Sequence, residues 1–223
     1  SLANVSKFLS DVNLTDLLTD ILKNRTVLSK FKSHSEICSE FGLNGNVSFE
    51  ECLNKNFDSK DLKVIKILRE SMKNGGVRDK AAAKKLSNIK SINLEFIKTL
   101  EDILLYKGST EKRPEYSAKT NSFASKAVLN EFLNSSIEQI NKLAARIEVF
   151  RQTRISYETS EKICALYDFS QIFLNHYTNE KLLRGWLDFD DLILKTQKLL
   201  IDPTIAAWIL YRLDGGIDHI LID

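Results

Sequence analysis

The chain has 223 residues, of which 43% are hydrophobic and 28% are charged, and its formal net charge is only +2. This size and composition allow a folded core of one large or two small units. No apolar run approaches the roughly 18 residues of a membrane span, and no signal peptide is recognisable, so we expect a cytoplasmic protein without a membrane partner.

The cysteines and histidines do not suggest a metal site. The three cysteines (Cys38, Cys52 and Cys164) are an odd number and lack metal-ligand spacing, and the three histidines are far apart in sequence. We therefore expect reduced thiols and no metal bound by these side chains.

The first half of the chain reads as a series of short helices. Prolines number two and glycines eight, which favours helices over turn-rich β architecture. Ser48 and Glu51 form a capping-box pattern that predicts a helix start. Residues 58–73 carry apolar side chains at helical spacing, and Asn74–Gly75–Gly76 ends that helix. The same spacing predicts further helices over residues 77–86 and 93–106.

Residues 106–122 are the least regular stretch, with a glycine, a proline and several bases. No glycine or proline then occurs between Pro114 and Gly185. This predicts two long helices, at about residues 123–153 and 156–183.

The C-terminal stretch predicts two capped helices and a strand. Asp188 is a good N-cap, and Asp190 and Asp191 place negative charge in the first helical turn. Asp202–Pro203 starts the second helix. Residues 217–222 are short, apolar and β-branched, which is typical of a buried strand. The sequence thus predicts an all-α multi-helix fold with two long helices and one short C-terminal strand candidate.

Charge is concentrated in the middle of the chain. Residues 60–126 hold 16 bases and 8 acids, a net charge of +8, whereas residues 1–59 and 127–223 have net charges of −2 and −4. Such a region is usually a solvated face, but it also suits phosphate contacts with nucleic acid.

The amino-acid sequence of the C-terminal stretch resembles that of a known family. LDFDDLI, followed by a helix and an apolar strand ending in aspartate, resembles the approach to the Walker B motif of UvrD-type superfamily 1 helicases. WILYRLDGGIDHILID is more similar still to the AddA subunits of bacterial AddAB helicase-nucleases. The likeness is dense over residues 185–223. KNGGVRDKAAAKKL and LLYKGSTEKRPEYSAKT resemble segments of the AddA helical insertion.

The resemblance implies a piece of a larger helicase, the helical insertion called 1B. Its implied parts are residues 1–106 (N-terminal helices), 107–122 (basic loop), 123–186 (long helical hairpin) and 187–223 (return to the motor core). The chain has no GxxxxGK[ST] phosphate loop, so we expect no catalytic residue and no cofactor in it. ATP and Mg²⁺ belong to the parent, where Asp223 would be the Walker B aspartate near Mg²⁺. In the chain alone, we expect Asp223 to be a terminal carboxylate.

The implied function is tracking of DNA, duplex or single-strand–duplex junction, during double-strand break repair. The residues expected to contact phosphates are the bases of the irregular loop: Lys107, Lys112, Arg113 and Lys119. Tyr106 and Tyr116 either stack on bases or anchor the loop to the helices.

Two other interpretations remain open. One is a helical interaction module whose basic middle faces an acidic partner such as an AddB-like subunit. The other is a stand-alone helical domain. Salt-dependent DNA binding separates the DNA-tracking interpretation from the interaction module.

Overall fold

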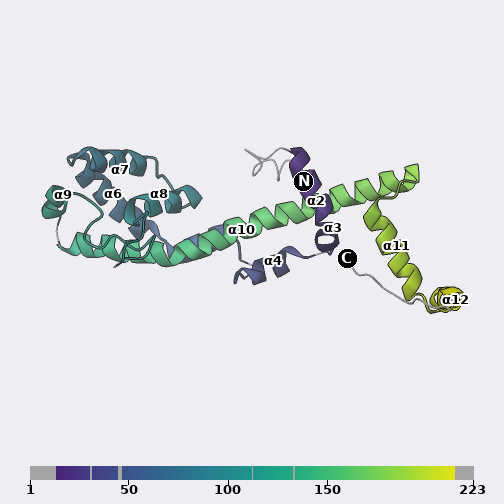
Figure 1. Cartoon of the computed structure of the whole chain (residues 1–223). Helices are drawn as coiled ribbons and strands as arrows, with labels where there is room; N and C mark the ends of the chain where they lie inside the picture. Colours follow the sequence, from purple (N-terminus) through teal and green to yellow (C-terminus); the bar gives the residue numbers. More distant parts are fainter. Residues whose placement is uncertain (1–13, 31, 45–46, 112, 133, 214–223) are drawn as a thin grey trace. The chain divides into compact units, whose positions relative to one another are not determined.

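The computed structural model of the chain describes residues 14–30, 32–44, 47–111, 113–132 and 134–213. The structure is about 75% helical, and its described residues form no strand, only two isolated bridges. The predicted all-α class is therefore confirmed (Figure 1). The strand candidate at residues 217–222 lies outside the described residues.

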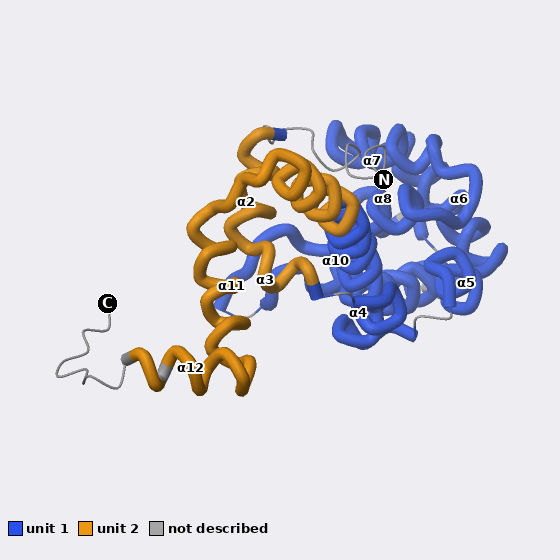
Figure 2. Tube along the Cα trace, turned by 90° about the vertical axis from the view of Figure 1, so that its right-hand side faces the viewer, with its two compact units in different colours: residues 1–14, 30–169 blue, residues 15–29, 170–223 orange. Residues whose placement is uncertain are grey.

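The chain divides into two compact units (Figure 2). Unit 1 consists of residues 1–14 and 30–169, and unit 2 consists of residues 15–29 and 170–223. Unit 1 contains the helices α4 (His34–Glu40), α5 (Phe49–Asn56), α6 (Ser59–Lys73), α7 (Val77–Ser87), α8 (Leu94–Leu104) and α9 (Lys126–Glu131). Unit 2 contains nearly all of α2 (Leu14–Lys23), together with α3 (Arg25–Leu28), α11 (Phe189–Ile201) and α12 (Pro203–Leu213). The helix α10 (Asn134–Arg184) begins in unit 1 and ends in unit 2. The domain boundaries expected after residues 106, 122 and 186 stay a prediction.

Local side-chain caps begin several helices where the sequence predicts them. The Ser48 hydroxyl accepts a hydrogen bond from the Glu51 amide at 3.1 Å, and the Glu51 carboxylate accepts one from the Ser48 amide at 3.3 Å. This is the predicted capping box. The Asn93 side chain caps α8 by accepting from the Phe96 amide at 2.9 Å. In both motifs the partners are three positions apart, which is why the sequence alone locates these helix starts.

The core of unit 1 lies where α6, α7, α8 and α9 gather beside the first part of α10 (Figure 1). The helix α8 supplies Phe96, Ile97, Leu100 and Leu104, each at most 1% exposed. The facing side of α10 supplies four residues that are fully buried: Ile140, Leu143, Ala144 and Ile147. Each large apolar side chain buried in this way stabilises the fold by about 1.5–3 kcal/mol. Unit 1 therefore has a continuous apolar core of its own.

The prediction of two long helices over residues 123–153 and 156–183 is wrong. After the short helix α9, the single helix α10 runs for 51 residues. Arg154, at the expected break, is 7% exposed and donates two hydrogen bonds to the Glu101 carboxylate, at 2.7 and 2.9 Å. Arg154 also pairs with Glu158 one turn further along α10. Because no glycine or proline interrupts this segment, nothing in the chain ends the helix there.

Gly185 ends α10 in the way that the sequence suggests. Its φ is +66°. This is a left-handed conformation that glycine adopts without steric cost. The Gly185 amide donates to the Leu182 carbonyl at 3.3 Å, and the Trp186 amide donates to the Lys181 carbonyl at 2.9 Å. These two bonds form a Schellman motif, which satisfies carbonyls at the helix end. The chain then enters α11 and α12, which pack on each other within unit 2.

Candidate nucleic-acid interface

Lys107 is an exposed member of the predicted DNA-contacting set. Its Nζ pairs with the Asp102 carboxylate, which also pairs with Lys85. Hydrogen bonds from Lys107, which has the larger effect, and from Lys85 lower the pKa of Asp102 below its ordinary value. An exposed ion pair contributes little net stability, so Lys107 could exchange Asp102 for a phosphate at small cost. Lys112, the neighbouring member of the set, lies outside the described residues.

Arg113 and Lys119 come together at the ring of Tyr106. The Arg113 guanidinium carbon lies 3.5 Å from the ring centroid and the Lys119 Nζ lies 5.9 Å from it. A second guanidinium, that of Arg151, covers the ring of Tyr116 at the same distance of 3.5 Å. Each tyrosine ring therefore already has a cation on one face. This arrangement favours the anchoring role for both tyrosines over base stacking.

Lys119 forms hydrogen bonds with the end of α8 that the sequence does not predict. Its Nζ donates a hydrogen bond to the Ile103 carbonyl at 2.6 Å, and its amide donates to the Leu104 carbonyl at 2.8 Å. The side chain is about half-buried, and desolvation lowers the pKa of its ammonium group. Its role in DNA contact stays a prediction.

Hydrogen bonds hold the irregular loop in place. The Tyr116 amide donates to the Tyr106 carbonyl at 2.8 Å, and the Ala118 amide donates to the Glu148 carboxylate on α10 at 2.9 Å. Tyr116 has a positive φ of 60°, which these contacts and Arg151 maintain. A left-handed backbone is unusual for such a bulky residue. The described part of the loop is thus bonded to the end of α8 and to α10.

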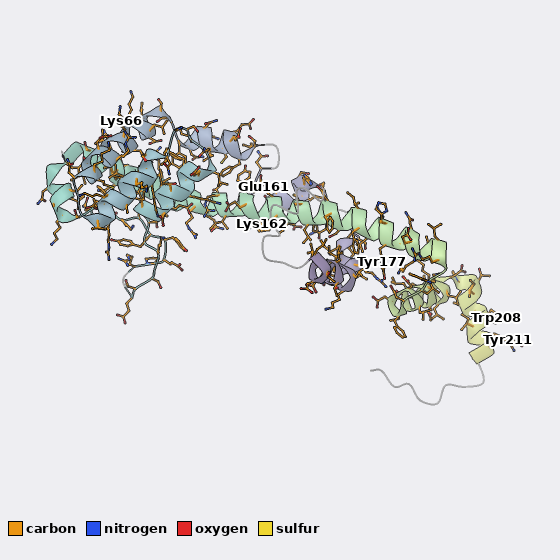
Figure 3. All side chains as sticks on the ribbon, turned by 90° about the horizontal axis from the view of Figure 1, so that it is seen from above. Lys66, Glu161, Lys162, Tyr177, Trp208 and Tyr211 are labelled. Carbon is orange, nitrogen blue, oxygen red and sulfur yellow. The ribbon has the colours of Figure 1, made fainter. Side chains whose placement is uncertain are left out.

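A second set of bases, missed by the sequence prediction, lies on α6 and α7. Lys63 and Lys66 on α6, like Lys80 and Lys84 on α7, are exposed and form no ion pair with the described residues. Lys66 is labelled on α6 in Figure 3. Spacings of three and four residues place each pair on one helix face. The sequence holds a signal for these lysines, since none of them belongs to the set of residues that each helix buries.

A glycine fixes the turn that joins these two helices. A Cβ on Gly75 would lie 2.4 Å from Asp79 Oδ2 and 2.7 Å from a methyl carbon of Val128. Only glycine, which has no Cβ, therefore fits this close approach. Asp79 is 5% exposed, and its carboxylate accepts hydrogen bonds from the amides of Gly76, at 3.0 Å, and Ser125, at 3.2 Å. This buried carboxylate thus ties the start of α7 to the rest of unit 1.

In unit 2, Asp188 is the centre of an ion-pair network. It caps α11 as predicted, accepting from the Asp191 amide at 2.9 Å. Arg25 donates two hydrogen bonds to its carboxylate, both at 2.7 Å, and Lys181 donates one at 2.9 Å. These two cations hold the pKa of Asp188 well below its ordinary value, and the hydrogen bonds from Arg25 have the largest effect. Asp190 also pairs with Arg25, at 3.1 Å. The aspartates of this motif thus have structural partners in unit 2.

Metal and membrane features can be reported for the described residues. There, no group of three or more His, Cys, Asp or Glu side chains is arranged to hold a metal ion. No helix in the same part of the chain has the length and apolar content to cross a membrane. The three cysteines are free thiols, and burial raises the pKa of Cys164 to about 11. Such a thiol is unreactive near neutral pH, because the thiolate is the reactive form. Asp223 lies outside the described residues.

Comparison with known proteins gives the class of the chain. Residues 18–223 match the family described as the UvrD/REP helicase N-terminal domain. The chain therefore belongs to this family, and the predicted UvrD-like relationship is confirmed. The match also extends further toward the N-terminus than the resemblance seen in the sequence. No curated protein and no solved structure matches the chain. The family supports a DNA-helicase type of function.

Proposed function

We propose that this chain is the helical 1B insertion of an AddA-type helicase-nuclease, and that it contacts DNA while the parent processes double-strand breaks. The observation that carries the proposal is a set of exposed lysines on α6 and α7, which pair with no carboxylate in the described part of the chain. They belong to a chain of the UvrD/REP helicase family. Lysines without carboxylate partners are free to neutralise phosphates, and such contacts supply affinity without sequence preference.

The loop bases have a smaller part in this proposal. Arg113 and Lys119 pack around Tyr106, and Lys107 is paired with Asp102. Contact with DNA at these positions would have to replace existing interactions. We therefore expect the α6–α7 lysines to supply more of the non-specific affinity than the loop.

Chemistry remains with the parent protein in this proposal. The chain contains no GxxxxGK[ST] phosphate loop, so ATP and Mg²⁺ would bind elsewhere in the parent. Calorimetric titration of the purified chain with ATP and Mg²⁺ should give no heat of binding. A micromolar dissociation constant would contradict this part of the proposal.

A protein-interaction role is supported by a separate feature of unit 2. Large apolar side chains on α11 and α12 are exposed, among them Phe189 at 85%, Ile193 at 65%, Trp208 at 61% and Tyr211 at 77%. Trp208 and Tyr211 are labelled on α12 in Figure 3. Contiguous exposed apolar surface marks protein contacts. The second candidate function is therefore docking to another protein surface, such as an AddB-like subunit.

Two matched four-fold variants test the DNA proposal. The helix variant replaces Lys63, Lys66, Lys80 and Lys84 with alanine. The loop variant replaces Lys107, Lys112, Arg113 and Lys119 with alanine, so both variants lose four positive charges. Fluorescence anisotropy of a labelled single-strand–duplex junction across a salt series gives the affinity and its salt dependence for each protein.

We expect the unsubstituted chain to bind in the range of about 10⁻⁴–10⁻⁶ M that is typical of non-specific contacts. The salt slope should fall by about 0.9 for each phosphate interaction that a variant removes, and it should fall further in the helix variant than in the loop variant. Undetectable binding by the unsubstituted chain would overturn the DNA role and favour the protein-interaction candidate. Equal salt slopes for the helix variant and the unsubstituted chain would show that these lysines of α6 and α7 do not contact DNA.

A further inference from the structure

A cavity of about 990 Å³ opens in unit 1 between α7, the end of α8 and the residues that follow the loop. Its apolar wall includes Ala82, Ile103 and Phe123. Its volume is at the upper end of the range of about 300–1,000 Å³ typical of ligand pockets. Of the predicted DNA-contacting residues, Lys107 and Lys119 line part of this cavity.

Positive charge predominates around the cavity. Four cationic side chains line it: Arg78, Lys85, Lys107 and Lys119. The two carboxylates that also line it already have partners. Asp79 accepts the amides of Gly76 and Ser125, and Asp102 is shared by Lys85 and Lys107. Four cations against two carboxylates leave a net charge of +2, so the cavity favours an anion.

Lys119 is a cation of this cavity that lacks a carboxylate partner among the described residues. Its Nζ is about half-buried and donates to the Ile103 carbonyl, yet it forms no ion pair with any carboxylate among the described residues. An ammonium group has three donors, so this one keeps donors available for a ligand. Desolvation already lowers the pKa of Lys119, and an anion in the cavity would offset that cost.

We propose that this cavity binds one phosphate group of a DNA strand, with Lys85, Lys107 and Lys119 surrounding the phosphate oxygens. Several flexible ammonium groups suit a phosphate, which offers oxygens in several directions, better than a planar carboxylate. The helix α7 connects the cavity with the exposed face, because it carries Lys85 at the cavity and Lys80 and Lys84 on its outer side. A strand on that face could place one phosphate in the cavity. This inference rests on the proposed DNA contact and names one of its sites.

The test uses single substitutions in the full chain and two kinds of ligand. Lys119→Met and Lys85→Met remove cavity charges and keep side-chain length, whereas Lys80→Met removes a charge from the same helix outside the cavity. The probe is a labelled oligothymidylate followed by anisotropy, and the competitors are thymidine monophosphate and inorganic phosphate. Circular dichroism checks folding, and Lys85→Met is the safer variant because the Lys85 side chain is 56% exposed.

Each cavity variant should weaken oligothymidylate binding by about tenfold, the usual effect of losing a hydrogen bond to a charged group. Competition by thymidine monophosphate should disappear in both cavity variants and persist in Lys80→Met. If thymidine monophosphate competes in both cavity variants as it does in Lys80→Met, while the unsubstituted chain binds DNA, the cavity proposal is overturned and the DNA proposal stands. If calorimetric titration shows that the small phosphates bind and the oligonucleotide does not, both proposals are overturned in favour of a free phosphate ligand. If the unsubstituted chain binds no DNA, both proposals are overturned.

Discussion

The helices α8 and α11 begin with the same kind of cap but differ in how far their apolar faces are buried. Both start with a side-chain cap, from Asn93 and Asp188, and both carry apolar residues at helical spacing. The helix α8 has six buried residues, and Leu100 and Leu104 are 0% exposed. The helix α11, which the structure describes in full, has no buried residue, and its Phe189 is 85% exposed. Apolar periodicity therefore predicts that a segment is helical, but it does not predict that the apolar face finds a partner within the chain.

The contrast extends to the way in which each unit is held together. Unit 1 buries a continuous apolar core, whereas the α11 part of unit 2 is attached through the Arg25–Asp188–Lys181 network. Hydrophobic burial depends little on pH, while an ion-pair network depends on the charge of its carboxylates. The two units should therefore respond differently to substitution and to acid.

The largest expected effect is in the core of unit 1. Leu100 is fully buried. Leu100→Ala should lower the free energy of unfolding by about 2–5 kcal/mol, because it leaves a cavity among buried side chains. The matched control is Leu183→Ala near the end of α10, where the leucine is 82% exposed. The control should change the free energy of unfolding by no more than about 0.5 kcal/mol. Denaturant unfolding followed by circular dichroism compares the two, and equal losses would show that the exposed leucine is buried in solution.

Local signals account for what the sequence predicts well, and long-range contacts account for what it misses. The caps at Ser48 and Asp188 and the stop at Gly185 all act within a few residues. Arg154, in contrast, bonds Glu101 from 53 positions away, so its place within one continuous helix gives no local signal.

The candidate site is predicted less well for the same reason. The loop bases stand out in the sequence because their segment is irregular, but the partners of Lys107 and Lys119 lie on α8. No pattern along the sequence reveals those pairings. The lysines of α6 and α7 can be read from helix periodicity once the buried face of each helix is assigned.

The next expected effect is on the ion-pair network of unit 2. Asp188→Asn keeps the side-chain shape but removes the charge that Arg25 and Lys181 contact. The loss of charge-assisted hydrogen bonds should destabilise the attachment of α11 by about 1–3 kcal/mol. Amide hydrogen exchange of residues 187–201 should accelerate, while that of residues 94–104 should not change. Faster exchange in both segments would mean that the two units do not respond separately.

Acid should act on the same network. The pKa of Asp188 is lower in the folded chain than its ordinary value. Its stabilising effect is therefore complete above about pH 4 and is lost as the pH falls further. The protection of residues 187–201 against exchange, taken relative to the intrinsic exchange rate at each pH, should thus fall below about pH 4 before that of α8. In Asp188→Asn this loss of protection should be smaller but still present, because the pKa of Asp191 is also lowered. An unchanged acid response in the variant would assign the effect to other carboxylates.

The smallest effect on stability is expected from the exposed apolar face of α11, although its effect on association should be clear. Phe189→Ser and Ile193→Ser replace side chains that are 85% and 65% exposed. Each should change the free energy of unfolding by no more than about 0.5 kcal/mol. Because exposed apolar surface promotes association, the double variant should self-associate less in sedimentation velocity at high protein concentration. The control is Val149→Ser, which removes a side chain that is 78% exposed on the unit 1 part of α10 and should leave association unchanged. A fall in stability of several kcal/mol in the double variant would instead mean that this face of α11 is packed within the folded chain, and the contrast with α8 would disappear.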